Sequence, residues 1–248
     1  MIDDGLETQS VAVTSPLAFL RSASLSHIGK VRQTNEDRVL DFPAHGLFAV
    51  ADGMGGHSLG DWAAMAVIQS LIAIGGTDVG QAAILSSLRA ANVRINAMAQ
   101  ERGVTCGSTI AGLVLAPSGK GLIFWAGDSR IYRLRDDRLD RLSSDHSVVQ
   151  ELLDAGVLTA SQAKVHPRGN VITRAVGVRP TLEIDFVAME SSPGDVYLLC
   201  TDGLSGAVDD NEIKDFLLHP VNAALDALIG LALDRGGKDN ISAVVVRV

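Results

Sequence analysis

The chain has 248 residues, of which 47% are hydrophobic and 20% are charged, and its formal net charge at pH 7 is −8. This composition is typical of a soluble globular protein with a sizeable core. The acidic balance argues against a nucleic-acid-binding protein, whose usual mark is a basic patch. No apolar run approaches the ~20 residues that a membrane-spanning helix requires.

The first residues, MIDDGLETQS, lack the basic start and the apolar stretch of a secretory signal. The two cysteines, Cys106 and Cys200, form no CxxC pair and cannot build a disulfide framework. Both observations favour a location in the reducing cytoplasm. Residues 1–22 show no sustained periodicity, so we expect an N-terminal tail there.

The next part of the chain predicts a strand, a turn, another strand and two helices. Residues 24–37 predict a short strand followed by a polar turn. The apolar run at 47–51 predicts a buried strand that ends abruptly at an aspartate. Helices are predicted at 61–74 and 79–102, and in the second helix apolar residues recur every three or four positions.

The rest of the chain changes mainly to strands on short connections, which require antiparallel pairing. The first strands are predicted at 108–116, 122–126, 131–135 and 138–142, the last two as a hairpin. Residues 144–170 interrupt this series, and we predict a flap with a helix capped by Ser144 or Asp145 and a second helix at 160–164. After the flap we predict strands at 171–176, 182–189 and 196–201, helices at 211–218 and 222–233, and a last strand at 242–248.

Three of the apolar runs end in a carboxylate. Asp52, Asp128 and Asp202 directly follow the predicted buried strands. A carboxylate in that position is costly unless it is hydrated, paired or bound to a metal ion. A turn or a helix cap remains the alternative for any single aspartate. Together with Glu36, Asp37 and Asp239, these residues are candidates to meet at one end of the sheet, where their oxygens would suit Mg²⁺ or Mn²⁺.

Several other enzyme classes are excluded by missing motifs. The chain has no GxxxxGK[ST] phosphate loop and no HExxH zinc motif. A dinucleotide-binding GxGxxG would need glycine where Ser58 stands. Neither cysteine is followed by an arginine six positions later, as a cysteine-phosphatase loop would require.

Seven short motifs then occur in a characteristic order: RQTNED (32–37), VADGMGGH (50–57), GST (107–109), AGDSR (126–130), SDHS (144–147), CTDGL (200–204) and KDNIS (238–242). In these motifs the sequence resembles the metal-dependent protein serine/threonine phosphatases of type 2C (PPM), and in particular the short bacterial members. The resemblance implies an α+β fold, a four-layer αββα sandwich of two antiparallel β-sheets flanked by helices. It also implies a single phosphatase catalytic domain over residues 23–248.

The same resemblance implies a site with two Mg²⁺ or Mn²⁺ ions, and a third in bacterial relatives. The implied ligands are Asp52, Asp202 and Asp239 for the first ion, Glu36, Asp52 and the Gly53 carbonyl for the second, Asp37 through a bound water, and Asp128 with Asp202 for the third. A glycine at position 53 would keep a side chain from crowding the ion. Arg32, Asp52 and Asp202 are the expected catalytic residues.

The expected function is hydrolysis of phosphoserine and phosphothreonine in proteins by a metal-bridged water, without a phosphoenzyme. The forked guanidinium of Arg32 matches a phosphoryl group, although it could instead neutralise the carboxylates. Many eukaryotic relatives carry a histidine two residues after the first aspartate. Here Met54 stands at that position and His57 lies three residues further on, so a metal-bound water is the alternative proton donor.

Two other functions stay open on the sequence: a non-catalytic phosphoprotein-binding regulatory module of the same fold, and a hydrolase of small phosphoesters. The expected partners are phosphorylated protein substrates and an opposing Ser/Thr protein kinase in signal transduction. Neither nucleic acid nor a membrane is expected.

Overall fold

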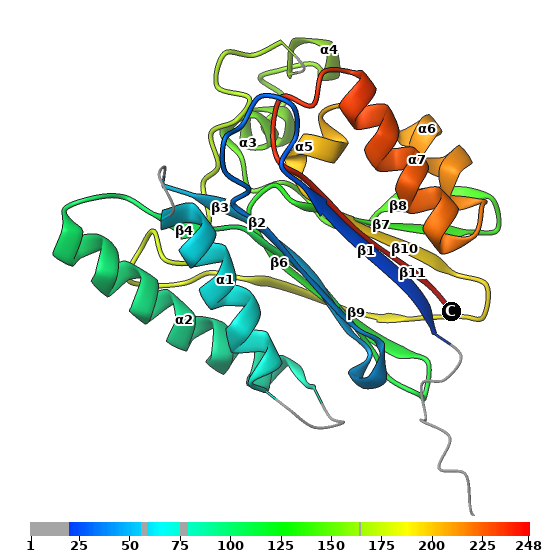
Figure 1. Cartoon of the computed structure of the whole chain (residues 1–248), viewed down its shortest axis with the longest axis horizontal. Coiled ribbons are helices and arrows are strands. Elements are labelled where there is room, and N and C mark those ends of the chain that lie inside the picture. The colour runs from blue at the N-terminus through cyan, green and yellow to red at the C-terminus, as the bar shows by residue number, and fades with distance from the viewer. Residues whose placement is uncertain (1–19, 56–58, 75–78, 164) are drawn as a thin grey trace, which may run out of the picture.

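Two antiparallel β-sheets lie face to face in the computed structural model, and helices cover the outer face of each sheet (Figure 1). The structure describes residues 20–55, 59–74, 79–163 and 165–248. One sheet has the strand order β1-β11-β10-β7-β8, and the other has the order β2-β3-β5-β6-β9 with β4 paired to β3. The predicted four-layer α+β sandwich is confirmed.

The strands span Arg21–His27 (β1), Asp37–Phe42 (β2), Leu47–Met54 (β3), Gly107–Ser108 (β4), Ile110–Leu115 (β5), Lys120–Ala126 (β6), Arg130–Arg135 (β7), Arg138–Arg141 (β8), Asp185–Glu190 (β9), Val196–Cys200 (β10) and Ile241–Arg247 (β11). The helices span Leu59–Ile72 (α1), Gln81–Arg102 (α2), Val148–Asp154 (α3), Ala160–Ala163 (α4), Asp202–Ser205 (α5), Asp210–Leu217 (α6) and Val221–Asp234 (α7), with a 3₁₀ turn at Pro43–His45.

Strand β3 is apolar on both faces because it lies between two layers of the core. Phe48 and Val50 pack between the sheets, whereas Leu47, Ala49 and Ala51 pack under α1 and α2. Strands buried on both faces read as continuous apolar runs rather than as alternating patterns. The packing therefore explains the run that the sequence shows before the first aspartate.

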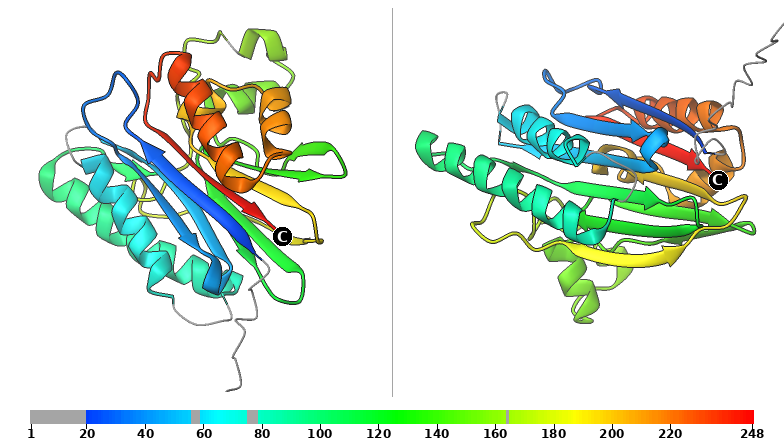
Figure 2. Two further views of the ribbon diagram at one scale, coloured as in Figure 1. Left: turned by 45° about the vertical axis from the view of Figure 1, so that its right-hand side comes forward. Right: turned by 90° about the horizontal axis from the view of Figure 1, so that it is seen from below.

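The helices form the two outer layers (Figure 2). Helix α2 buries Ile84, Leu88 and Ile95 toward the six-stranded sheet, which confirms the predicted apolar stripe. Gly103 ends α2 in the left-handed conformation, with φ at 65°. On the other side of the sandwich, α5, α6 and α7 cover the five-stranded sheet.

The strand predictions were wrong in two places: one strand was missed and one was predicted where none forms. Strand β2 was not predicted, because its sequence DRVLDF is polar and only partly buried at the edge of its sheet. Residues 171–176 were predicted as a strand, but they make only two isolated bridges, Val176 with Ser108 and Ile172 with Ser147. The two bridges have different partners, so no continuous ladder forms. The predicted hairpin of β7 and β8 is confirmed, with positive φ at both turn residues, Asp136 and Asp137.

The segment predicted as a flap contains the two short helices α3 and α4. The cap of α3 is Ser147, whose hydroxyl accepts the N–H of Gln150, and not Ser144 or Asp145. Asp145 is engaged elsewhere, because its carboxylate accepts three hydrogen bonds from Arg130.

The predicted tail lies mostly outside the described residues, which begin at Leu20. Strand β1 already starts at Arg21, inside the stretch that we assigned to the tail, and pairs with β11. Within the described part of the chain, no helix combines the length and the apolar character needed to cross a bilayer.

We expect Gly112→Ala to lower the free energy of unfolding by about 1–3 kcal/mol, the usual range for overpacking a core. A Cβ at this position in β5 would lie 2.1 Å from the ring of Phe124, which is fully buried on the paired strand. Urea denaturation measures the change. The matched control is Gly230→Ala in α7, where nothing lies within 4 Å of the added Cβ and helix propensity favours alanine by about 1 kcal/mol. Equal stability of the Gly112 variant and the wild type would contradict the packing described here.

Candidate metal centre

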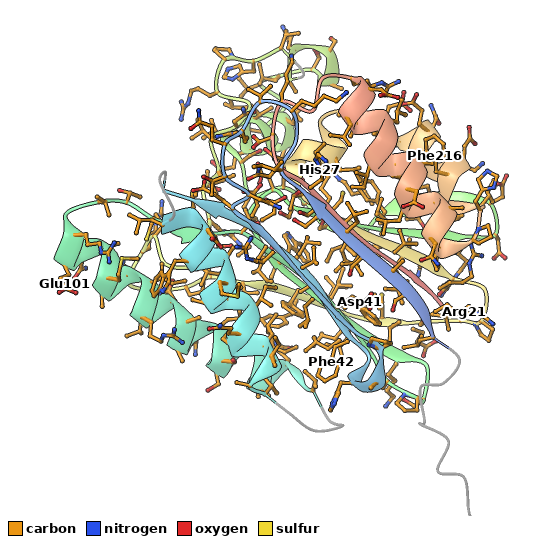
Figure 3. The ribbon with its side chains drawn as sticks, viewed as in Figure 1. Arg21, His27, Asp41, Phe42, Glu101 and Phe216 are labelled. Atoms are coloured by element: carbon orange, nitrogen blue, oxygen red, sulfur yellow. The ribbon has the colours of Figure 1, made fainter. Side chains whose placement is uncertain are left out.

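A cavity of about 290 Å³ opens at the end of the sandwich where β3, β6 and β10 finish and where β2 and β11 begin. The same end carries His27, the last residue of β1, whereas Arg21 lies at the opposite end (Figure 3). The cavity is lined by Arg32, Thr34, Glu36, Asp52, Gly53, Met54, Gly55, Thr109, Asp128, Asn170, Ile172, Asp202, Asp239 and Asn240. Every predicted site residue except Asp37 lies on this lining.

Asp37 lies beside the lining, on the strand next to Asp52. The two residues are directly paired in the register of β2 and β3. Asp37 is 1% exposed, and its Oδ2 accepts a hydrogen bond from the Thr201 hydroxyl at 2.9 Å. Burial raises the pKa of the Asp37 carboxyl to about 7, and the neighbouring charges of Asp202 and Asp239 add to the shift.

Asp52 and Asp202 reach the cavity from different sheets. Asp52 belongs to β3, and Asp202 is the first residue of α5, directly after β10 and Thr201. Burial raises the pKa of both carboxyls, and for Asp52 the charges of Asp37 and Asp202 raise it further. A hydrogen bond from the Asp52 carboxyl favours the ionised form of Asp202 and partly offsets its shift.

Arg32 and Asp239 form an ion pair at the rim, with 2.7 Å between Nη2 and Oδ2. This hydrogen bond raises the pKa of the Arg32 guanidinium, and the nearby charges of Asp52 and Glu36 act in the same direction. About half of the Arg32 side chain is exposed. The structure thus places the one predicted cation at the mouth of the cavity, where it neutralises a carboxylate and remains accessible.

Asp128 follows β6 in a loop held from two sides. A Cβ at Gly127, where φ is 120°, would collide with the Thr109 side chain at 2.6 Å, so the loop needs glycine to approach so closely. On the other side, His146 donates its backbone N–H to the Gly127 carbonyl, and its Nδ1 accepts the Gly127 N–H. Burial raises the pKa of the Asp128 carboxyl to about 7, with Asp202 and Asp145 contributing.

Gly53 is required for backbone packing, which is a reason for glycine that is independent of any ion. A Cβ at Gly53 would lie 2.1 Å from the carbonyl oxygen of Gly60 and 2.7 Å from that of Glu36. The Gly53 N–H also donates to the Glu36 carbonyl at 3.1 Å. A side chain would therefore displace the start of α1 and the loop before β2, whether or not an ion is present.

The sequence argument assigned no role to the polar residues that hold this end of the sandwich together. Asn240 is 6% exposed; its side chain accepts the Glu36 N–H and donates to the carbonyls of Ile28 and Thr34. The Thr109 hydroxyl accepts the Asp52 N–H and contacts the Ser129 hydroxyl. Their motifs, KDNIS and GST, were recognised, but a pattern of letters does not show which hydrogen bonds a side chain will make.

The donor set of the cavity fits a divalent cation. All of its anionic groups are carboxylates, the ligand type that Mg²⁺ and Mn²⁺ prefer. One oxygen of Asp37 and one of Asp202 are buried without a hydrogen-bond partner, an arrangement that a cation would relieve. Among the described residues, no three acidic, histidine or cysteine side chains are already arranged to hold an ion.

Met54 lines the cavity, as expected from its position after Asp52, and no histidine does so within the described residues. His57 lies outside the described residues. His146 contacts Gly127 and Asp185 and holds the loop that leads into the flap segment, which is a structural role.

Comparison with known proteins places these features in a family. A family model described as protein phosphatase 2C matches residues 25–242. The chain is 39% identical over 238 residues to the serine/threonine protein phosphatase PstP of Mycobacterium tuberculosis (strain CDC 1551 / Oshkosh), covering 92% of this chain and 45% of PstP. The chain therefore spans about half the length of this relative.

Two solved structures share the fold. PppA of Pseudomonas aeruginosa, described as a key regulatory component of T6SS, is 44% identical with a TM-score of 0.85, covering 92% of this chain and 97% of that one. The catalytic domain of the serine/threonine protein phosphatase PstP in complex with two manganese ions is 36% identical with a TM-score of 0.83, with the same coverage.

The matched region runs from β1 to the second residue of β11, so it contains every segment that contributes to the cavity. The chain belongs to the protein phosphatase 2C family.

Proposed function

We propose that this chain is a Mg²⁺- or Mn²⁺-dependent protein phosphatase that hydrolyses phosphoserine and phosphothreonine in protein substrates. The observation that carries the proposal is the meeting of Asp52 and Asp202 in one cavity. They come from different sheets and are far apart in the sequence, and burial disfavours their ionised forms. Such a pair is costly in a protein that has no cation to bind.

The proposed ligands are the carboxylates of Asp52, Asp202 and Asp239 for one ion, Glu36, Asp52 and the Gly53 carbonyl for a second, and Asp128 with Asp202 for a third, with Asp37 acting through a water. When bound, such ions lower the pKa of a water molecule and screen the charge of a phosphoryl group. The manganese-bound structure of PstP supports this assignment by similarity.

Arg32 is proposed to bind the phosphoryl group of the substrate. Its guanidinium lies at the mouth of the cavity and is half exposed, so an incoming phosphate can reach it. Asp239 holds the guanidinium in place through the 2.7 Å ion pair. If Asp239 held an ion, the Arg32 donors that it now engages would be available to pair with two phosphoryl oxygens.

Protein substrates and an opposing Ser/Thr kinase are proposed from the bacterial relatives, of which one is named as a serine/threonine protein phosphatase and another as a protein phosphatase. Both cysteines of the chain are free and buried, which is compatible with the proposed cytoplasmic location.

We expect Asp202→Asn to lower kcat on a phosphothreonine peptide by on the order of 100-fold or more, because the variant loses a charged ligand aimed at the reacting centre. Asp52→Asn should behave in the same way. Phosphate release in saturating Mn²⁺, with and without EDTA, is the measurement. Asp226→Asn on α7 is the control, because this exposed aspartate does not line the cavity and its loss should leave turnover unchanged. Wild-type turnover by Asp202→Asn would refute the assignment. If the wild-type protein binds the phosphothreonine peptide with and without EDTA but releases no phosphate, it is a non-catalytic module.

Arg32→Ala should chiefly raise KM, by roughly tenfold or more, since a hydrogen bond to a charged group contributes about 1.5–3 kcal/mol. Steady-state kinetics on the same peptide and on a nucleoside monophosphate separate KM from kcat. If Arg32 only neutralises Asp239, the variant would instead change the affinity for Mn²⁺ and leave the KM for substrate intact. A higher kcat/KM for the nucleotide than for the peptide would favour a small-phosphoester hydrolase.

The metal-free protein should become less stable as the pH rises from about 4 to about 7. The folded state holds protons on Asp37 and Asp128 up to about pH 7, whereas unfolded aspartates release them near pH 4. In this window the folded state binds more protons than the unfolded state, so the free energy of unfolding falls with pH.

Urea unfolding at pH 5 and pH 8, in EDTA and in saturating Mn²⁺, tests this dependence. Mn²⁺ favours ionised carboxylates and should reduce or remove the loss at pH 8. In EDTA, Asp128→Asn should show a smaller loss than the wild type, because one titrating group is gone. A metal-free protein that is more stable at pH 8 than at pH 5 would contradict the predicted direction.

A further inference from the structure

A second groove, of about 150 Å³, adjoins the cavity of the candidate metal centre. Met54 and Ile172 line both, so the two spaces adjoin at these residues. The outer wall of this groove is the irregular segment 172–183, which includes most of the stretch that we wrongly predicted as a strand. A ligand that fills the cavity can therefore extend into the groove past Met54.

Met54 and Thr105 line the other side of the groove, here called its floor, and main-chain pairing of the adjoining strand β4 holds this floor in place. Gly107 in β4 pairs with Met54, and Ser108 exchanges two backbone hydrogen bonds with Val176, at 2.9 and 2.8 Å. A Cβ at Gly107 would lie 2.6 Å from the Val176 carbonyl and 2.7 Å from Val178, so only glycine allows these segments to approach so closely. The floor is thus tied directly to the strand end that carries Asp52.

Hydrogen bonds from helix α2 hold this wall in place. Asn92 is 1% exposed; its side-chain amide donates to the carbonyls of Arg179 and Pro180 and accepts the Gly177 N–H at 2.6 Å. Asn96 donates to the Gly177 carbonyl at 3.1 Å. A buried amide with every group engaged fixes a loop in one conformation. The groove is therefore a built feature of the fold, although its wall is not a helix or a strand.

Two arginines line the groove, and they differ in their electrostatic partners. Arg174 pairs with Asp185 at 2.8 Å and with Glu183 at 3.5 Å, so its charge is compensated. Arg179 is exposed and makes no ion pair with any residue that the structure describes. Its guanidinium leaves an uncompensated positive charge beside the apolar side chains of Val178 and Met54.

We propose that this groove binds the stretch of substrate polypeptide next to the phosphorylated residue, and that Arg179 selects an acidic side chain in that stretch. The inference rests on the proposed phosphatase function and adds a determinant of its substrate preference. The shared boundary with the cavity proposed to bind the phosphoryl group favours a segment of the same substrate chain as occupant. The apolar contacts suit a peptide backbone and its side chains, and the unpaired arginine suits a carboxylate.

The test compares phosphothreonine peptides that differ only in one flanking residue, glutamate or alanine, scanned over the positions on both sides of the phosphothreonine. For the wild type in Mn²⁺, kcat/KM should be roughly two- to fivefold higher with glutamate at one or two positions, the range of an exposed ion pair. Arg179→Glu should abolish or reverse this preference, and Arg179→Lys should retain part of it. Hydrolysis of p-nitrophenyl phosphate, which has no flanking residues, should be unchanged in both variants.

Arg94→Glu is the matched control, because Arg94 is an exposed arginine of α2 that does not line the groove. It makes the same change in net charge, so any general effect on acidic peptides appears in this variant as well. Equal responses of Arg94→Glu and Arg179→Glu would overturn the proposal, as would an Arg179→Glu variant that keeps the wild-type preference.

The remaining outcomes are also decisive. A wild type that hydrolyses p-nitrophenyl phosphate and the peptides but ignores the flanking glutamate overturns the subsite alone. A wild type that hydrolyses neither class in Mn²⁺ overturns the proposed function and the subsite together. If Arg179→Glu changes the oligomeric state in light scattering and leaves peptide preference unchanged, the groove accommodates a second copy of the chain and the proposal fails.

Discussion

The structure depends on several carboxyl groups that are buried together at one end of a β-sandwich. Asp37, Asp52, Asp128 and Asp202 all have raised pKa values, and burial is the first cause in each case. Ionising all of them in a small, partly dry space is unfavourable, because each new charge meets desolvation and the repulsion of the others. This is a poor arrangement for stability alone, and it becomes favourable when divalent cations supply the missing positive charge.

Much of the surrounding polar structure serves to hold these groups in place. Asn240 joins the loop that carries Arg32 and Glu36 to the segment that carries Asp239, and Thr109 holds the backbone of Asp52. These residues carry no charge, so they add constraint without adding repulsion. Glycines at contact points let the backbones approach within distances that no side chain would permit.

The cavity and the adjoining groove are built from different parts of the chain. Strand ends of both sheets supply the acidic residues, whereas the wall of the groove belongs to the irregular segment after α4 that α2 clamps through Asn92. Met54 stands at their boundary, two residues from Asp52. Substitutions in the wall of the groove leave the sheets intact, because the wall belongs to a separate segment. The proposed substrate preference can therefore change while the acidic residues of the cavity stay the same.

The sequence by itself determined the sandwich, the central strands and the acidic residues of the cavity, because apolar runs that end in aspartate and motifs in a fixed order are local features. It missed β2 and gave a strand at 171–176, since an edge strand and a loop with two different bridge partners have no periodic signature. Only the tertiary structure decided that Arg32 pairs with Asp239, that Asp37 lies beside the lining, and that Arg179 lines a groove with no ion-pair partner among the described residues. Those outcomes depend on which distant side chains are brought within a few ångströms of each other, and no local pattern encodes that.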